Sequence, residues 1–128
     1  MEIISLSLDG ETLSKIDEIQ EKASFNGRSE MIRKAIEGLH QELIERENVK
    51  GDINAVIVVR HPHKHEHGIS NISHSFDEVI TTQLHNKLNN EKCLEVFHVK
   101  GEAEKIVELQ NQLEGSKHTE AVDILIQK

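Results

Sequence analysis

The sequence has one cysteine, one proline and three phenylalanines among its 128 residues, and it has neither tryptophan nor tyrosine. A single cysteine, Cys93, excludes an internal disulfide framework. With so few aromatic residues, any core must be built from Leu, Ile, Val and Ala. The length permits one ordinary domain or two very small ones, and a half-chain of about 50 residues with such a core is marginal alone. We therefore expect the protein to oligomerise and bury additional apolar surface between chains.

Long hydrophobic runs are also missing. No apolar run approaches ~18 residues, so the sequence predicts no membrane span, and residues 1–5 lack the pattern of a signal peptide. These absences favour a cytoplasmic protein. The formal net charge is −8, and residues 1–46 carry six Lys/Arg against ten Asp/Glu. DNA binding by this half therefore requires that its basic residues share one face, and non-specific DNA binding should be weak.

The N-terminal half, residues 1–46, has the pattern of one strand followed by two helices. Apolar and polar residues alternate over residues 2–8, which predicts a short strand with one buried face. Asp9 is typical of a helix N-cap, and a turn precedes a second helix capped by Asn26 or Ser29. The strand has no partner within this half, but two copies can pair their strands across a two-fold axis. We therefore predict a ribbon-helix-helix domain that exists as a homodimer.

A two-stranded ribbon of this kind fits the major groove of double-stranded DNA. Its outward residues would meet base edges, although an ordinary half-exposed strand has the same alternation. At the start of the second helix, free backbone N–H groups together with Arg28 and Ser29 can bind a phosphate. Arg33 either reaches the DNA backbone or is a solvated charge. The candidate DNA-binding residues are Ile3, Ser5, Ser7, Arg28, Ser29 and Arg33.

The C-terminal half, residues 52–128, follows a linker at residues 47–51 and mixes both periodicities. Strands are predicted at residues 53–60, 79–88, 93–99 and 121–126, and helices at residues 69–77 and between Gly101, which precedes the helix, and Gly115, which caps it. Pro62 and Gly68 argue against regular strand in residues 61–68. The order βαββαβ describes a ferredoxin-like or ACT-type domain. The whole chain is therefore expected to be an α+β protein of two domains.

A candidate metal site lies on the predicted hairpin of this second domain. His85 and Cys93 are on its two strands, and they share a face only if the connecting loop holds an odd number of residues. A loop of residues 89–91 would pair Lys87 with Cys93 and place His85 diagonally, whereas a two-residue loop would separate the two side chains. His74 precedes the hairpin. Imidazole and thiolate suit Ni, Cu, Co or Zn; alternatively, Cys93 is a small core residue and the histidines are surface polar groups.

Nine histidines are present, and four of them recur at every second position, at His61, His63, His65 and His67. In an extended chain these four would share a face and could bind a metal ion. In a flexible loop they would be an adventitious chelator, as a purification tag is. Both interpretations stay open on the sequence alone.

Over its whole length the chain resembles the nickel-responsive, NikR-type transcriptional repressors. The first 45 residues match without a gap, including residues 26–30, and a second match comprises His74, His85 and residues 93–95 with the family's spacing. The resemblance implies a metal-dependent regulator with nickel as its cofactor and a double-stranded DNA operator as its partner.

The resemblance also implies an assembly. The family forms a homotetramer in which two N-terminal dimers flank a core of four ACT-like domains, with nickel bound between protomers. By resemblance, His85 and Cys93 come from one chain and His74 from its neighbour, while positions 3, 5 and 7 contact bases. Metal binding would then order the tetramer core and set the distance between the two DNA-binding dimers.

The ligand set departs from the family at Lys87, which stands where a second strand histidine is usual. A protonated lysine offers no lone pair and repels a divalent ion. Three outcomes are open. Lys87 loses its proton and binds the metal, or its place in the ligand set is taken by water, Glu95 or a histidine from residues 61–67. In the third outcome, the site favours Cu(I) or Zn over nickel. Glu30 matches one of a carboxylate pair that helps to hold a second cation in the family, but its partner position is Lys34.

The sequence therefore predicts a non-enzymatic, metal-responsive regulator of transcription. The same architecture answering to copper, zinc or a small molecule is the first alternative, and an altered ligand set would distinguish it. A ribbon-helix-helix antitoxin is the second, but antitoxins usually end in a disordered toxin-binding tail, unlike the patterned C-terminal half here. A small enzyme is disfavoured because no recognisable catalytic motif accompanies the His, Cys and carboxylate residues.

Overall fold

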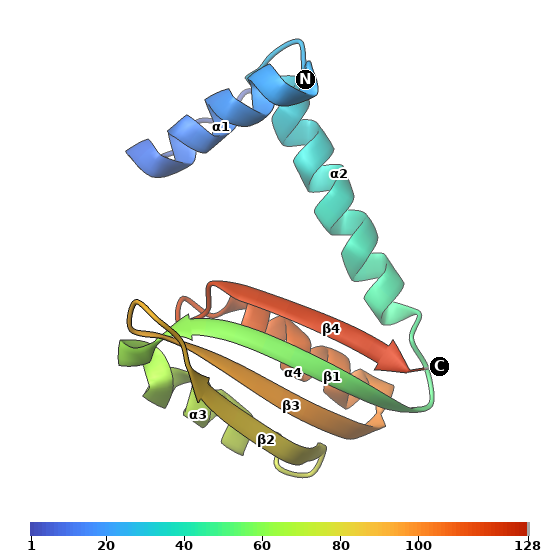
Figure 1. The fold of residues 1–128 in the computed structure, drawn as a ribbon. Coiled ribbons are helices and arrows are strands. Elements are labelled where there is room, and N and C mark those ends of the chain that lie inside the picture. Colours follow the sequence, from blue (N-terminus) through green and yellow to red (C-terminus); the bar gives the residue numbers. More distant parts are fainter. Residues whose placement is uncertain (128) are drawn as a thin grey trace. The chain divides into compact units, whose positions relative to one another are not determined.

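The computed structural model describes residues 1–127. The chain divides into two compact units, Met1–Ile44 and Glu45–Lys128. The first contains helix α1 (Gly10–Ala23) and most of helix α2 (Arg28–Glu47). The second contains β1 (Asp52–Pro62), the short 3₁₀ helix η1 (His63–His65), α3 (Glu66–His74), β2 (Ile80–Lys87), β3 (Lys92–Glu102), α4 (Ala103–Gly115) and β4 (Ala121–Gln127) (Figure 1). None of the described helices is long and apolar enough to cross a membrane.

Helix α1 begins where the sequence predicted. The Asp9 carboxylate accepts a hydrogen bond from the backbone N–H of Thr12 at 2.7 Å, so Asp9 is the N-cap. This bond to the backbone N–H also lowers the pKa of the Asp9 carboxyl below its usual value. The helix ends at Ser24, which adopts a left-handed conformation with φ 57°.

Helix α2 begins differently from the prediction. The N–H of Met31 donates to the carbonyl of Gly27 at 3.2 Å, so Gly27 occupies the N-cap position and the prediction that Asn26 or Ser29 caps the helix is wrong. Ser29 lies in the first turn. The Glu30 carboxylate accepts from the Asn26 N–H at 3.1 Å, which gives Glu30 a structural role at the helix start.

The predicted strand at residues 2–8 does not form in a single chain, where residues 1–9 have neither helix nor strand. A strand is defined by hydrogen bonds to a partner strand, and the expected partner is a second copy. The apolar side chains of this segment are correspondingly exposed, with Ile4 at 77% and Leu6 at 57%. In residues 1–44 the buried hydrophobic residues are Ile16 and Met31. The ribbon therefore stays a prediction.

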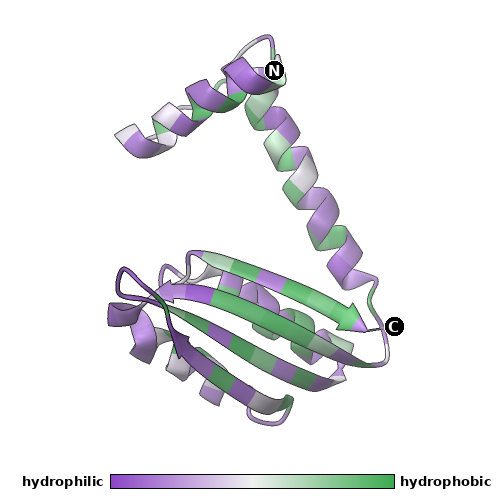
Figure 2. Ribbon diagram, viewed as in Figure 1, coloured by the Kyte–Doolittle hydropathy of each residue, from purple (hydrophilic) through white to green (hydrophobic). Residues whose placement is uncertain are grey.

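The second unit is built on one four-stranded antiparallel sheet with the strand order β2-β3-β1-β4. Its element order confirms the predicted βαββαβ arrangement. Odd-numbered residues of β1 and β3 face α3 and α4, and Figure 2 shows apolar residues along β1, β3 and β4. The buried core comprises Ala55, Ile57, Val59, Ile69, Phe76, Val79, Phe97, Val99, Ile106, Leu109 and Leu113.

The segment of residues 61–68 is more regular than the sequence suggested. Strand β1 continues through His61 to Pro62, and α3 already begins at Glu66 rather than at residue 69. Pro62 is tolerated because it ends the strand. Gly68 lies inside α3, where an added Cβ would come within 2.3 Å of the His118 ring. The glycine therefore permits close packing and does not end the helix.

The β2–β3 hairpin has a three-residue loop, which is the length that places His85 and Cys93 on the same face of the sheet. The Leu88 N–H donates to the Lys92 carbonyl at 2.7 Å, and Lys87 pairs with Cys93. Within the loop, Asn90 and Glu91 have left-handed backbones, with φ values of 64° and 57°. The Glu91 carbonyl accepts from the N–H of His63 at 2.7 Å. This bond ties η1 to the hairpin beside Cys93.

Candidate metal centre

Three possible ligands gather on the helix-covered face of the sheet. Cys93 of β3 pairs with His61 of β1 on one side and with Lys87 of β2 on the other, while His85 pairs with Glu95 one step along. One ligand atom from each of His61, His85 and Cys93 lies within 4.8 Å of the other two. The three-residue loop of the hairpin thus brings His85 and Cys93 together. The third member of the group is His61 rather than His74 of the same chain.

His61 is held in a fixed orientation. Its side chain is wholly buried, and its Nδ1–H donates to the carbonyl of Pro62 at 2.8 Å. A carbonyl can only accept, so Nδ1 carries a proton and Nε2 is the atom available to a ligand. Nε2 lies 2.5 Å from the Glu95 carboxylate, whose other oxygen accepts from the Gln83 amide at 2.7 Å. His61 and Glu95 therefore form a buried pair directly beside Cys93.

A second carboxylate approaches the cluster from α3. Glu66 lies 3.1 Å from Nδ1 of His85 and 3.7 Å from Nδ1 of His63. Nδ1 of His63 is also 3.5 Å from the Cys93 sulfur. The His85 side chain is 29% exposed and that of His63 is 49% exposed. The group therefore reaches from the buried Cys93 to the surface.

The Cys93 thiol is fully buried. Burial raises its pKa above the usual value, and the negative charges of Glu66 and Glu95 act in the same direction, while Lys87 opposes them. A thiolate at this position therefore requires a cation beside it. A metal ion would supply that charge, so metal binding should release the thiol proton.

The remaining predicted metal residues lie elsewhere. His74 ends α3 with an exposed side chain, and His67 is exposed earlier on the same helix. His65 packs against His118, with ring centroids 4.9 Å apart, and its pKa is lowered by burial and then by His118. The role that the family resemblance gives His74, as a ligand to a neighbouring subunit's site, stays a prediction.

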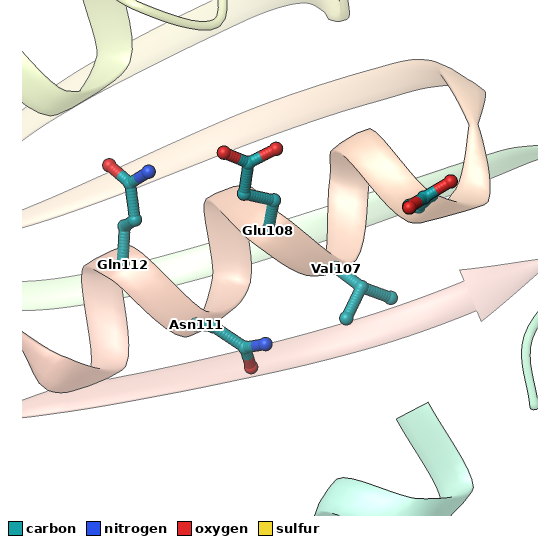
Figure 3. Close-up of a pocket in the computed structure, with 5 residues that line it drawn as sticks. Val107, Glu108, Asn111 and Gln112 are labelled. Carbon is teal, nitrogen blue, oxygen red and sulfur yellow. The ribbon is translucent and has the colours of Figure 1, made fainter. Parts of the chain in front are cut away.

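A cavity of about 260 Å³ opens next to the cluster and is lined by His63, Lys87, Leu88, Glu91 and Lys92. His63 borders both this cavity and the Cys93 sulfur, so the cavity offers a path from solvent to the ligands. A larger depression of about 460 Å³ lies along the exposed side of α4 (Figure 3). It is lined by carboxylates, amides and Val107, with no histidine or cysteine, so it offers no soft metal donors.

The candidate DNA-binding residues are accessible in the single chain. Ile3, Ser5 and Ser7 are exposed, and no described contact brings them together with the helix-start residues. Arg28 pairs with Asp17 at 2.9 Å, both more than half exposed. Such a surface pair is weak and can exchange for a phosphate. The exposed Ser29 and Arg33 lie on α2.

Two residues of the cluster were not predicted from the sequence. Glu66 was counted only as part of the histidine-rich stretch, and Gln83 was not singled out as part of the site. Both act through contacts with distant residues, Glu66 with His85 of β2 and Gln83 with Glu95 of β3. No local motif announces such pairs, although Glu66 is three residues from His63, a separation that a helical turn brings together.

The donor set of this cluster fits a transition metal. Imidazole nitrogens and a thiolate favour Zn, Cu, Co or Ni over Mg or Ca. Carboxylates or carbonyls in contact with the ring nitrogens of ligand imidazoles are the usual outer support of such sites, and Glu66 and the Pro62 carbonyl hold these positions here.

Comparison with known proteins gives a consistent picture. The family model described as the NikR C-terminal nickel-binding domain matches residues 54–126. Proteins named as nickel-responsive regulators are similar over nearly the whole chain. The one from Methanococcus maripaludis strain C5 is 30% identical over 98% of this chain and 92% of its own length, and the one from Methanocaldococcus jannaschii is 31% identical over the same shares. The one from Methanothrix thermoacetophila is 34% identical over 90% of this chain and 86% of its own length.

Among solved structures, an uncharacterised protein from Thermotoga maritima aligns over all of its chain and 62% of this one, with a TM-score of 0.51 and 20% identity. At that identity the likeness concerns the fold alone.

Proposed function

The chain belongs to the nickel-responsive, NikR-type regulator family, and from that membership we propose that it is a metal-responsive transcriptional regulator that binds a DNA operator. A DNA-binding role also implies that it works in the cytoplasm. The regulatory role of the relatives favours a non-enzymatic protein.

The observation that carries this proposal is the convergence of His61 and His85 with Cys93, inside the domain that matches the family's nickel-binding model. The buried thiol is the anionic donor of the group, and the histidines supply neutral donors. A bound nickel ion supplies the positive charge that stabilises the Cys93 thiolate. Glu66 orients His85, and the Pro62 carbonyl orients His61.

The sensing residues are well placed to influence the rest of the fold. Cys93 lies on β3 beside the central strand β1, and His63 and Glu66 join η1 and α3 to the hairpin. Drawing these side chains together would fix η1, α3 and β2 relative to one another. If one quaternary state of the oligomer is better served by that fixed arrangement, metal binding shifts the population toward it.

The DNA-binding half is proposed to be a ribbon-helix-helix homodimer, with base contacts from Ile3, Ser5 and Ser7. The exposed apolar side chains of residues 1–9 support it, because pairing two strands would cover Ile4 and Leu6. Arg28, Ser29 and Arg33 would hold the DNA backbone. A homotetramer through the second unit completes the proposal by analogy with the family.

The test of the proposal is metal-dependent DNA binding by the untagged full chain. A random-sequence duplex library would be selected with Ni²⁺-loaded protein, and the affinity for the enriched duplex measured with and without Ni²⁺. We expect Ni²⁺ to tighten binding by at least about 10-fold, within the range of ordinary allosteric coupling. Cys93→Ala should abolish that response.

The matched control is His67→Ala, which removes an exposed histidine from the same stretch without touching the cluster. It should keep the full response to Ni²⁺. Equal DNA affinity of the wild-type chain with and without metal would refute the proposal, and so would a full Ni²⁺ response in Cys93→Ala.

A further inference from the structure

The position that Lys87 occupies raises the question of what completes the metal site. Lys87 pairs directly with Cys93 across β2 and β3. Its ammonium group has no lone pair to donate. A planar nickel site with four strong donors therefore does not fit the β2–β3 hairpin of this chain by itself.

His61 occupies the opposite side of the same cysteine. Because β1 pairs with β3 in the register His61↔Cys93, His61 flanks Cys93 on the side opposite to Lys87. Its ligand atom is within 4.8 Å of those of His85 and Cys93. The side chain is wholly buried and its Nδ1–H is held by the Pro62 carbonyl. Its Nε2 therefore lies in the cluster on the central strand β1, where it contacts the Glu95 carboxylate in the absence of metal.

His63 lies outside that group of three but next to it, and it is the nearest candidate for a fourth donor. Its Nδ1 lies 3.5 Å from the Cys93 sulfur, and its backbone N–H is fixed by the Glu91 carbonyl at 2.7 Å. With metal–sulfur and metal–nitrogen bonds of typical length for zinc, the sulfur–nitrogen edge of a tetrahedron is about 3.5 Å. With the same bond lengths, neighbouring donors in a square plane are only about 3.1 Å apart. The Cys93–His63 separation therefore equals the edge of a tetrahedron, and metal binding would have to draw the half-exposed His63 ring toward His61 and His85.

We propose that one chain supplies four metal donors, His61, His63, His85 and Cys93, in a tetrahedral arrangement that suits Zn²⁺ and Co²⁺ and holds nickel only in a non-planar form. This inference rests on the proposed metal site and specifies its ligands. Glu66 supports His85 from outside, whereas Glu95 contacts Nε2 of His61 and must release this nitrogen when the metal binds. Both carboxylates offset the charge of Lys87. A site contained in one chain does not need the His74 of a neighbouring subunit.

The experiment is a titration of the untagged, reduced full-length protein with Co²⁺, Zn²⁺ and Ni²⁺, followed by absorption spectroscopy. Cobalt should give the intense visible bands of tetrahedral coordination together with a thiolate charge-transfer band. His61→Ala and His63→Ala should each weaken Co²⁺ binding by roughly 100-fold, the upper end of what loss of even an outer partner costs. His74→Ala is the matched control and should keep the wild-type Co²⁺ affinity and spectrum.

His61 is buried against Glu95, so thermal unfolding of the metal-free variants is measured first. If His61→Ala is unfolded, His63→Ala decides the matter, because His63 is 49% exposed and its loss should not disturb the core. A planar nickel spectrum from the wild-type protein would overturn the inference. Loss of Co²⁺ binding in His74→Ala, or unchanged binding in His63→Ala, would also overturn it.

The Cys93→Ala variant distinguishes a failure of the four-donor site from a failure of the proposed sensing site. If Cys93→Ala loses metal but the His63 variant does not, the proposed sensing site stands and only the single-chain tetrad fails. If Cys93→Ala binds all three metals as the wild type does, the proposed function loses its site as well.

Discussion

The two units of this chain differ in how much apolar surface each can bury alone. In the second unit, side chains such as Ile57, Ile106 and Leu109 are fully buried between the sheet and its helices. In the first unit, Ile16 and Met31 are buried, while Leu6 and Ile36 remain 57% and 62% exposed. The second unit can therefore be stable by itself, whereas the first buries too little apolar surface to be stable without a partner.

This difference has a counterpart in the functional residues. The histidines, cysteine and carboxylates of the metal cluster meet through strand pairing within one chain. The candidate DNA-binding residues lie apart in a single chain, and Ser5 and Ser7 are on a segment without regular structure. In the proposed function, the metal site comes from one copy of the chain, while the ribbon that reads DNA comes from two.

The strongest way to break this comparison is to disturb the proposed ribbon. Leu6→Lys places a charge on the face that would be buried between two strands, and burying an unpaired charge is very costly. We expect the variant to lose operator binding entirely at micromolar concentration and to unfold at a lower temperature, although Leu6 is exposed in the single chain. Electrophoretic mobility shift and thermal unfolding would measure both effects.

The control for this variant is Ile3→Lys, on the outward face of the same segment and 96% exposed. It should alter sequence preference but preserve the thermal stability of the protein. A Leu6→Lys protein that melts at the wild-type temperature would mean that the first unit does not bury this face against a second copy.

The next effect tests the self-sufficiency of the second unit. Leu109 of α4 is fully buried in the core, and Leu109→Ala should lower the free energy of unfolding by about 3 kcal/mol. Leu39→Ala, at a position 52% exposed in the single chain, is the companion variant. Urea unfolding over a range of protein concentrations would compare them. A concentration-dependent cost for Leu39→Ala would show burial in an assembly, and a cost near zero for Leu109→Ala would contradict the core described here.

Much of the second unit follows from local sequence patterns. The alternation of side chains reduced the question of whether His85 and Cys93 share a face to the length of the hairpin loop, and the three-residue loop of the structure places them on one face. The N-cap role of Asp9 was likewise visible, because the rule involves residues only three positions apart.

The features that were missed depend on contacts between distant residues. Pro62 was taken as a sign that the strand ends before His61, but β1 is a central strand and continues because β3 pairs with it throughout. The buried pair of His61 and Glu95 joins residues 34 positions apart in sequence, so no local pattern reveals it. Gly68 similarly counted only as evidence against a strand, and its packing role was missed because the His118 ring that lies against it comes from the other end of the domain.

The smallest expected effect concerns an ion-pair network at the edge of the second unit, where the comparison predicts that stability comes from one chain alone. Glu120 accepts hydrogen bonds from Lys92 at 2.9 Å and from Arg60 at 3.3 Å, and its side chain is 29% exposed. The hydrogen bond from Lys92, followed by the charges of Lys92 and Arg60, lowers the pKa of the Glu120 carboxyl below its ordinary value of 4.5. A lowered folded-state pKa means that the stabilisation is complete above pH ~4.5 and is lost as the pH falls through the folded pKa.

Glu120→Gln should therefore lower the free energy of unfolding at pH 7 by no more than about 1 kcal/mol, and the difference from wild type should vanish in acid. Urea unfolding of the metal-free chain at a series of pH values from 7 downward would measure this, with Glu104→Gln on exposed α4 surface as the control. The effect should shrink in high salt but should not depend on protein concentration, since all three residues belong to one chain. A difference that grows toward acid pH, or that changes with protein concentration, would place the network at an interface between chains and remove the contrast between the two units at this edge.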